Sequence, residues 1–290
     1  MAIALPRLSR SAQASDSTSL QAVDFLLLAY LGLVTVVAAV RVKDRSAFWW
    51  LLLAHALFVV LLFLLTRPGL SRVRRAIREL YPLFLLPGLY SELDILNPVS
   101  LPVYDRIVQQ WELWLFGAQL SQEWWQTAPS RFLSSVLHAA YLSYYAIVSA
   151  PALYFAWRGN LEAVRRFVLV VMTTFVLCYL FFIFFPVAGP YYTFPHPPAW
   201  FTDNAPARLV YRALETGSSY GAAFPSSHVA AALAATLTAG RVSRQLGYIL
   251  HLPTLLLTLG VVYCQMHYAV DAAAGLVVGA LVSWALLRKP

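Results

Sequence analysis

Cysteine is scarce in this chain, which has only two among its 290 residues. Cys178 and Cys264 both lie inside apolar runs, where a free cysteine behaves as a small buried hydrophobic residue. The scarcity argues against a disulfide framework and against a thiolate metal site. We therefore expect two buried free thiols.

Charge is sparse as well, because 12% of the residues are charged and 60% are hydrophobic. A soluble chain of this length needs more polar surface than that, so the composition predicts an integral membrane protein. The net charge of +8 does not indicate a nucleic-acid partner. The basic residues fall mostly in short loops between apolar runs, where they orient membrane proteins.

A third absence concerns the N-terminal segment. Residues 1–21 are polar and rich in serine and alanine, and they contain no apolar core followed by a small-residue cleavage site. We expect a disordered tail there. No internal repeat is visible, and residues 22–290 are predicted to form a single membrane-embedded catalytic domain.

Long apolar runs, by contrast, are abundant. A helix rises about 1.5 Å per residue, so about 20 apolar residues cross a hydrocarbon core of about 30 Å. The runs predict an all-α fold, a polytopic membrane bundle of about six to seven transmembrane helices. Gly275 and Gly279 have the spacing of small residues at a close helix contact. The predicted helices cover residues 22–40, 47–65, 132–157, 164–185, 226–239, 246–264 and 268–287.

Two segments do not fit this pattern. The apolar run at 81–88 is too short to span and contains Pro82 and Pro87, which favours a re-entrant or interfacial piece and leaves open whether 76–90 crosses the membrane. Residues 91–131 mix acidic residues with tryptophans, which is typical of a segment at the headgroup level. A solvated loop is the alternative. The residues concerned are Glu92, Asp94, Asp105, Glu112 and Glu123 with Trp111, Trp114, Trp124 and Trp125.

Polar residues open two of the last apolar helices, although unpartnered polar groups are costly in hydrocarbon. The first helix begins with Ser226-Ser227-His228, after Phe224-Pro225. Free backbone N–H groups and the positive end of the helix dipole favour an anion such as phosphate at such a start. We therefore predict that Ser226 and Ser227 bind phosphate beside His228.

The second helix opens with His267 and Asp271 at positions i and i+4, where a carboxylate can orient an imidazole. One histidine could then attack phosphorus while the other protonates the leaving oxygen. This chemistry needs no metal and no cofactor, and we expect none. Two alternatives are interfacial histidines satisfied by backbone carbonyls and a zinc site of two histidines and one carboxylate. Zinc is less favoured because Asp271 is better placed to orient its neighbour.

These motifs resemble those of the type 2 phosphatidic acid phosphatase superfamily, and within it the branch that contains inositol phosphorylceramide synthases. Pro225-Ser226-Ser227-His228 matches the Pro-Ser-x-His element, and the stretch from His267 to Asp271 matches His-x-x-x-Asp in its His-Tyr-x-x-Asp form. Weaker likeness extends the resemblance over about residues 80–287. The weaker stretches are Leu115-Phe116-Gly117, residues 141–151 and residues 185–192.

The resemblance implies roles for the three polar residues. His267 would be the nucleophile, Asp271 its orienting partner and His228 the general acid. It also implies transfer of a phospholipid headgroup to a lipid alcohol, with the phospholipid, the alcohol and the membrane as partners. Hydrolysis of a lipid phosphate is the alternative. A proton-coupled transporter is a distant one, because the middles of the spans are nearly free of charge.

The basic residues that hold phosphate in the wider family are missing at their usual places. Its Ser-Arg pair would fall at Val261 and Gly260, and the lysine of its Lys-x6-Arg-Pro element would fall at Val60. Side chains on the loop before His228 are the predicted substitutes. For the arginines of this loop, the alternative is ordinary contact with lipid headgroups. The predicted substitutes are Tyr191, Tyr192, Arg208 and Arg212.

The distribution of basic residues predicts the orientation of the site. The short loops on one side of the last spans carry the arginines, which places those loops in the cytoplasm. The loop at 186–224 and both histidines would then face away from the cytoplasm, in the cell's inner or plasma membrane. The basic residues are Arg158, Arg165, Arg166, Arg241, Arg244, Arg288 and Lys289.

Overall fold

The computed structural model describes residues 19–67 and 71–288. In this part of the chain the regular structure is helical, apart from one isolated bridge between Val187 and Ala222. The predicted all-α fold is confirmed. Residues 1–18 of the predicted tail and Lys289 lie outside the described residues. Gln21, the last residue of that predicted tail, instead caps the first helix.

The chain divides into two compact units, residues 1–81 and 82–290. The first contains α1 (Ala22–Arg41), α2 (Arg45–Leu65) and the beginning of α3 (Arg72–Leu96). Inside it, the buried Asp24 carboxylate forms an ion pair with the fully buried Arg78 and accepts a hydrogen bond from the Tyr81 hydroxyl. A buried charge is stable only when paired in this way.

Helix α3 differs from the prediction, because it continues through Pro82 and Pro87. A proline inside a helix costs about 3 kcal/mol. Beyond the prolines, Leu89, Leu93 and Leu96 are buried along one face of the helix. Burial of each leucine contributes about 1.5–3 kcal/mol, so the three together are comparable to the loss at the two prolines. The sequence did not predict a regular helix here. Helix α3 is not among the candidate spans described below, and an interfacial position for residues 76–90 stays a prediction.

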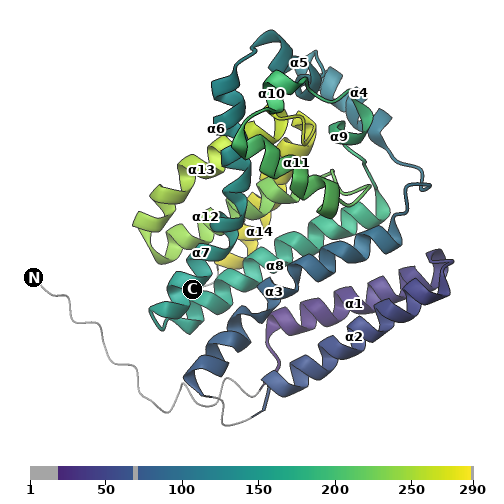
Figure 1. Ribbon diagram of the computed structural model, residues 1–290. Helices are drawn as coiled ribbons and strands as arrows, with labels where there is room; N and C mark the ends of the chain where they lie inside the picture. The colour runs from purple at the N-terminus through teal and green to yellow at the C-terminus, as the bar shows by residue number, and fades with distance from the viewer. Residues whose placement is uncertain (1–18, 68–70, 289–290) are drawn as a thin grey trace, which may run out of the picture. The chain divides into compact units, whose positions relative to one another are not determined.

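The second unit contains the remaining helices. They are α4 (Asp105–Phe116), α5 (Leu120–Thr127), α6 (Arg131–Leu142), α7 (Tyr144–Trp157), α8 (Leu161–Phe184), α9 (Pro190–Thr193), α10 (Ala199–Thr202), α11 (Ala205–Gly217), α12 (Ser227–Val242), α13 (Arg244–Tyr263) and α14 (Ala269–Leu287). The loop predicted at 186–224 thus includes α9, α10 and α11. Figure 1 shows α4, α5, α9 and α10 gathered at one end of this unit.

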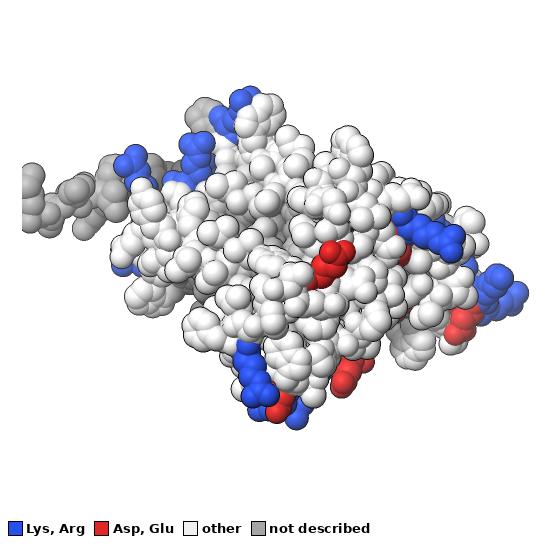
Figure 2. All heavy atoms as spheres, turned by 90° about the horizontal axis from the view of Figure 1, so that it is seen from above, with Lys and Arg blue, Asp and Glu red and all other residues white. Residues whose placement is uncertain are grey.

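Six helical segments in the described part of the chain are long and apolar enough to cross a membrane. They are α1, α2, the consecutive pair α6–α7, α8, α13 and α14. The protein is therefore an integral membrane protein with a polytopic helix bundle. Figure 2 agrees, since uncharged side chains dominate the face it shows and charged residues occur there singly or in small groups.

Helix α12 is the centre of the second unit. Its 16 residues are too few to count among the six candidate spans. It packs instead against α7, α8, α13 and α14, and most of its alanines are fully buried. Because other helices surround α12, it does not have to be long enough to cross the hydrocarbon core by itself. Both native cysteines are also buried and free, as predicted.

Close packing of α14 on α12 depends on the two predicted glycines. A Cβ atom on Gly275 would lie 2.6 Å from the Ser226 carbonyl oxygen, and one on Gly279 would lie 2.5 Å from the Ala230 carbonyl oxygen. Both contacts are with backbone atoms, which cannot move aside as a flexible side chain does. The two helices approach as closely as glycine allows.

Replacing Gly279 by alanine should therefore destabilise the protein by about 1–3 kcal/mol, the usual cost of overpacking a core. Thermal unfolding in detergent measures the effect. Gly32→Ala is the matched control, because a Cβ at Gly32 would meet nothing within 4 Å. If the two variants unfold at the same temperature, the close approach of α12 and α14 is not rigid.

Candidate active site

The first part of the site is the start of α12. Ser226 is the N-cap residue, and its hydroxyl accepts a hydrogen bond from the Val229 N–H at 3.4 Å. The Ser226 N–H in turn donates to the Asp271 carbonyl oxygen at 2.9 Å. The starts of α12 and α14 are therefore joined by a direct main-chain hydrogen bond. Ser226 and Ser227 are both buried there, and their binding of phosphate stays a prediction.

The second part is the turn between α13 and α14. The prediction placed His267 and Asp271 in one helix. His267 instead lies in this turn, before the N-cap residue Tyr268. The two side chains still meet, with 3.4 Å between His267 Nδ1 and Asp271 Oδ2. Asp271 Oδ2 also accepts the Tyr268 N–H at 2.9 Å. The capping geometry of α14, rather than helical spacing, brings the carboxylate to the imidazole.

The two histidines face each other, with 5.7 Å between their ring centroids. His228 Nε2 lies 3.1 Å from the Tyr141 hydroxyl, and the Tyr144 ring centroid is 4.5 Å from that of His228. His228 Nδ1 is buried without a hydrogen-bond partner among the described residues. The structure thus brings the predicted pair together in aromatic surroundings.

The electrostatics of the turn favour a neutral His267. Burial lowers the pKa of His267 to about 4, and a backbone hydrogen bond at Ala223 acts in the opposite direction. His267 is only about 5% exposed. The imidazole is therefore uncharged at neutral pH, the state in which a ring nitrogen can act as a nucleophile.

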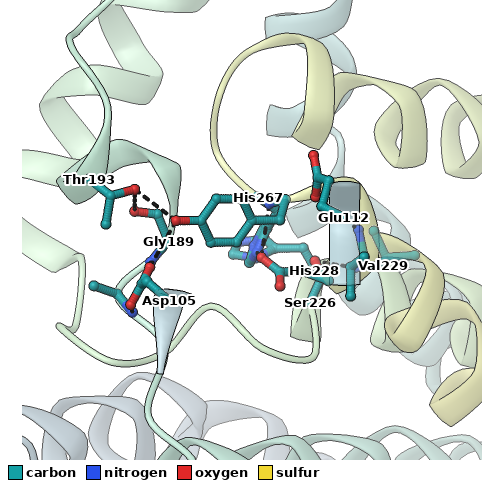
Figure 3. Close-up of polar contacts among 12 residues, drawn as sticks. Asp105, Glu112, Gly189, Thr193, Ser226, His228, Val229 and His267 are labelled. Atoms are coloured by element: carbon teal, nitrogen blue, oxygen red, sulfur yellow. Dashed lines mark hydrogen bonds and ion pairs between the residues drawn. The ribbon is translucent and has the colours of Figure 1, made fainter. Parts of the chain in front are cut away.

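A buried carboxylate on α4 fixes the loop next to the histidines. Asp105 accepts hydrogen bonds from the Ala188 and Gly189 N–H groups, both at 2.8 Å, and from the Tyr268 hydroxyl at 2.9 Å. The Tyr268 hydroxyl also contacts Thr193 Oγ1 at 2.7 Å. Figure 3 shows Asp105, Gly189 and Thr193 together on one side of the histidine pair. Asp105 therefore links α4, the start of the loop and the residue that follows His267.

Gly189 is needed in this arrangement for two reasons. Its φ angle of 91° lies in the left-handed region, and a Cβ atom there would lie 2.9 Å from the Ala223 Cβ. Any other residue would be strained and crowded. The loop consequently passes close to the segment that leads into α12.

Glu112, two turns along α4 from Asp105, reaches the start of α14. Its Oε2 accepts the Val270 N–H at 3.3 Å, whereas its buried Oε1 has no partner among the described residues. Burial raises the pKa of Glu112 to about 7, hydrogen bonds from Val270 and other backbone groups oppose the shift, and the charge of Asp271 adds to it. The prediction placed Asp105 and Glu112 in a headgroup-level segment. Both are buried because they bind backbone N–H groups of the site.

Replacing Glu112 by glutamine should stabilise the protein at pH 8 and have little effect near pH 4. A carboxyl whose pKa is raised on folding contributes stability below its unfolded pKa, and that stability is lost as the pH rises through its folded pKa. The shift from 4.5 to about 7 places the loss between those values. We expect a gain of roughly 1–3 kcal/mol at pH 8.

Thermal unfolding of the unchanged protein and of Glu112→Gln at pH 4, 6 and 8 measures this difference in stability. Effects of other titrating groups cancel in the comparison, because both proteins share them. A constant difference at all three pH values would show that folding does not shift the pKa of Glu112.

The four predicted phosphate-binding residues of the loop lie at two places. Tyr191, Arg208 and Arg212 border an open cavity of about 510 Å³. Arg208 also pairs with the exposed Asp203 at 2.6 Å. Tyr192 instead donates its hydroxyl to Ser218 Oγ at 2.9 Å. The two histidines do not border this cavity, and a role of these four residues in phosphate binding stays a prediction.

A zinc site was one of the two alternatives for the histidines. Among the described residues, no group of three or more His, Cys, Asp and Glu side chains is arranged to hold a metal ion. The contacts of the histidine pair in this part of the chain also include no lysine or arginine.

Comparison with known proteins gives one match. A family model described as the PAP2 superfamily matches residues 107–286, which is more than half of the chain. No match was found among curated proteins or among solved structures. The matched region contains most of α4, both histidines and Asp271. Since the match covers more than half of the chain, the chain belongs to the PAP2 superfamily, whose members are generally phosphatases or phosphotransferases.

Proposed function

We propose that this membrane protein transfers the phosphate-containing headgroup of a phospholipid to a lipid alcohol, through an intermediate on His267. The observation that carries the proposal is the pair of facing imidazoles, 5.7 Å apart, with the buried Asp271 carboxylate at His267 Nδ1. This is the arrangement that a histidine nucleophile and a histidine acid require.

In the first step His267 Nε2 attacks phosphorus, and a P–N bond forms as the P–O bond to the diacylglycerol oxygen breaks. His228 gives its proton to that leaving oxygen. Asp271 stabilises the positive charge that develops on the His267 ring. In the second step the acceptor alcohol attacks phosphorus, His228 takes its proton, and the P–N bond breaks.

The start of α12 supplies the charge stabilisation. The N–H groups of its first turn and the positive end of its dipole favour the phosphate oxygens. The negative charge of the bound phosphate also favours the protonated form of His228, which the first step needs. Ser226 and Ser227 hold this turn in place.

Transfer is favoured over hydrolysis by the apolar surroundings of the histidines. Tyr141 and Tyr144 pack on the His228 ring, and Trp111 lies against Phe224, next to the start of α12. Such walls exclude water and accept acyl chains. A lipid alcohol can therefore reach the intermediate more readily than water. Hydrolysis of a lipid phosphate is the second candidate, since water needs no further binding groups.

The test uses purified protein in vesicles with a headgroup-labelled phospholipid, with ceramide or diacylglycerol as acceptor or with neither. We expect label to move to the acceptor, with little free headgroup phosphate. Release of the label into water at the same rate with and without acceptor would favour the hydrolase. A parallel assay in EDTA should give the same rate; loss of activity that zinc restores would indicate a metal site.

We also propose that the histidines face away from the cytoplasm. They lie at the starts of α12 and α14, whereas Arg241, Arg244 and Arg288 lie at the other ends of α12, α13 and α14. Basic residues favour the cytoplasmic side. The site and the basic ends would then lie on opposite sides of the membrane.

A cysteine at Asn204 should therefore react with a membrane-impermeant thiol reagent in intact cells, and one at Ser243 only after permeabilisation. The native Cys178 and Cys264 should not react, because both are fully buried. Mass spectrometry of the labelled protein reads out each position. The reverse pattern would place the histidines on the cytoplasmic side.

A further inference from the structure

A second cavity lies at the end of the bundle away from the histidines. It has a volume of about 630 Å³ and is bordered by the last turns of α12 and α14 and the first turns of α13. The 16 residues of α12 correspond to about 24 Å of helix, so this cavity is separate from the catalytic end.

The border of the cavity is basic. Arg241, Arg244 and Arg288 all face it, and no aspartate or glutamate borders it. Among the described residues, none of these arginines forms a salt bridge. Three arginines without acidic partners favour an anion with several oxygen atoms, such as a phosphate group.

A buried hydroxyl points to the same ligand chemistry. Ser283 on α14 borders the cavity and is only about 2% exposed. Its Oγ has no hydrogen-bond partner among the described residues. A buried polar atom without a partner is costly. A phosphate oxygen in the cavity would accept a hydrogen bond from the hydroxyl and remove that cost.

Aromatic residues at the rim favour a lipid as the source of the phosphate. Trp284 and Tyr248 border the cavity and are largely exposed. In a membrane protein, such side chains lie at the boundary of hydrocarbon and headgroups. The Arg288 guanidinium lies 3.5 Å from the centre of the Trp284 ring. This contact holds the Arg288 charge at the same membrane depth as Trp284.

We infer that this cavity binds the phosphate headgroup of an anionic phospholipid, in the leaflet opposite the catalytic histidines. The arginines contact the phosphate, Ser283 donates a hydrogen bond to it, and the rim aromatics pack beside the acyl chains. Basic pockets between transmembrane helices bind anionic lipids in this way. The inference does not depend on which reaction the histidines catalyse.

The test compares retention of phosphatidylglycerol by the detergent-solubilised protein, measured by native mass spectrometry. The variant Arg241→Gln/Arg244→Gln should retain it about tenfold less well than the unchanged protein, because each arginine contributes to binding an anionic lipid. Arg158→Gln is the matched control, since Arg158 belongs to another loop predicted to lie on the same side of the membrane and does not border the cavity. It should retain the lipid normally.

Two further arms complete the experiment. Phosphatidylcholine, which has no net charge, should be retained equally by all variants, and millimolar inorganic phosphate should not displace phosphatidylglycerol. Displacement of phosphatidylglycerol by phosphate would contradict the inference that the ligand is a lipid. An equal loss of phosphatidylglycerol from Arg158→Gln would contradict the inference that the lipid binds in this cavity. Arg288→Gln, at the exposed end of α14, provides the same comparison if the double variant does not fold.

Discussion

Replacing His267 by alanine should lower turnover of a labelled phospholipid by about 10⁴-fold or more, because no other group can form the covalent intermediate. The fold should survive. His267 lies in a turn, and its main-chain N–H, which donates to Val261 at 2.8 Å, is unaffected by the change. Rapid acid-free quenching with a substrate labelled at phosphorus should trap label on the unchanged protein and none on the variant.

The control is His138→Ala, which removes a buried histidine on α6 that borders Cys264 rather than the histidine pair. It should affect stability more than the chemical step. Near-normal turnover in His267→Ala, with an unchanged unfolding temperature, would show that the nucleophile lies elsewhere.

Replacing His228 by alanine should lower turnover by about 10²–10⁴-fold with a natural lipid, the usual contribution of a general acid. The loss in the first step, measured as the initial burst of p-nitrophenol, should nearly vanish with a p-nitrophenyl leaving group, which departs without a proton. A residue that only binds substrate would cause the same loss with both substrates. The ratio of the two effects therefore separates acid catalysis from binding.

Tyr141→Phe is the comparison for this experiment, because the Tyr141 hydroxyl lies 3.1 Å from His228 Nε2. We expect a much smaller loss in that variant, with a similar dependence on the leaving group. Equal losses with both substrates in His228→Ala would contradict the role as acid.

The sequence was most informative where structure and chemistry depend on residues close together in the chain. Long apolar runs predicted the spans because length and hydropathy alone decide whether a helix can cross a membrane. The Pro-Ser-Ser start of α12 and the pair His267 and Asp271 are local motifs too. Their meeting in one site followed from the chemistry they share and from family resemblance.

The sequence was less informative about contacts between distant segments. Asp105 and Glu112 bind backbone N–H groups of residues about 80 and 160 positions away. Almost any residue type supplies a backbone N–H, so such a partner cannot be recognised in the sequence. One signal was present, however. Asp105, Val108 and Glu112 have the i, i+3, i+7 spacing of a single helix face, and all three are buried.

Proline misled the reading of α3 for a similar reason. The penalty at Pro82 and Pro87 is local and visible, whereas the burial of Leu93 and Leu96 that offsets it depends on the tertiary fold. Arg78 is a further example, because this buried arginine pairs with Asp24, which is 54 residues away.

The main-chain hydrogen bond between Ser226 and Asp271 has a consequence for how this site can change. It fixes the starts of α12 and α14 relative to each other without using a side chain. Exchange of a neighbouring side chain such as Tyr144, which packs on the His228 ring, therefore leaves this main-chain link in place. The walls of the site can in this way change shape while the starts of α12 and α14 keep their relative position.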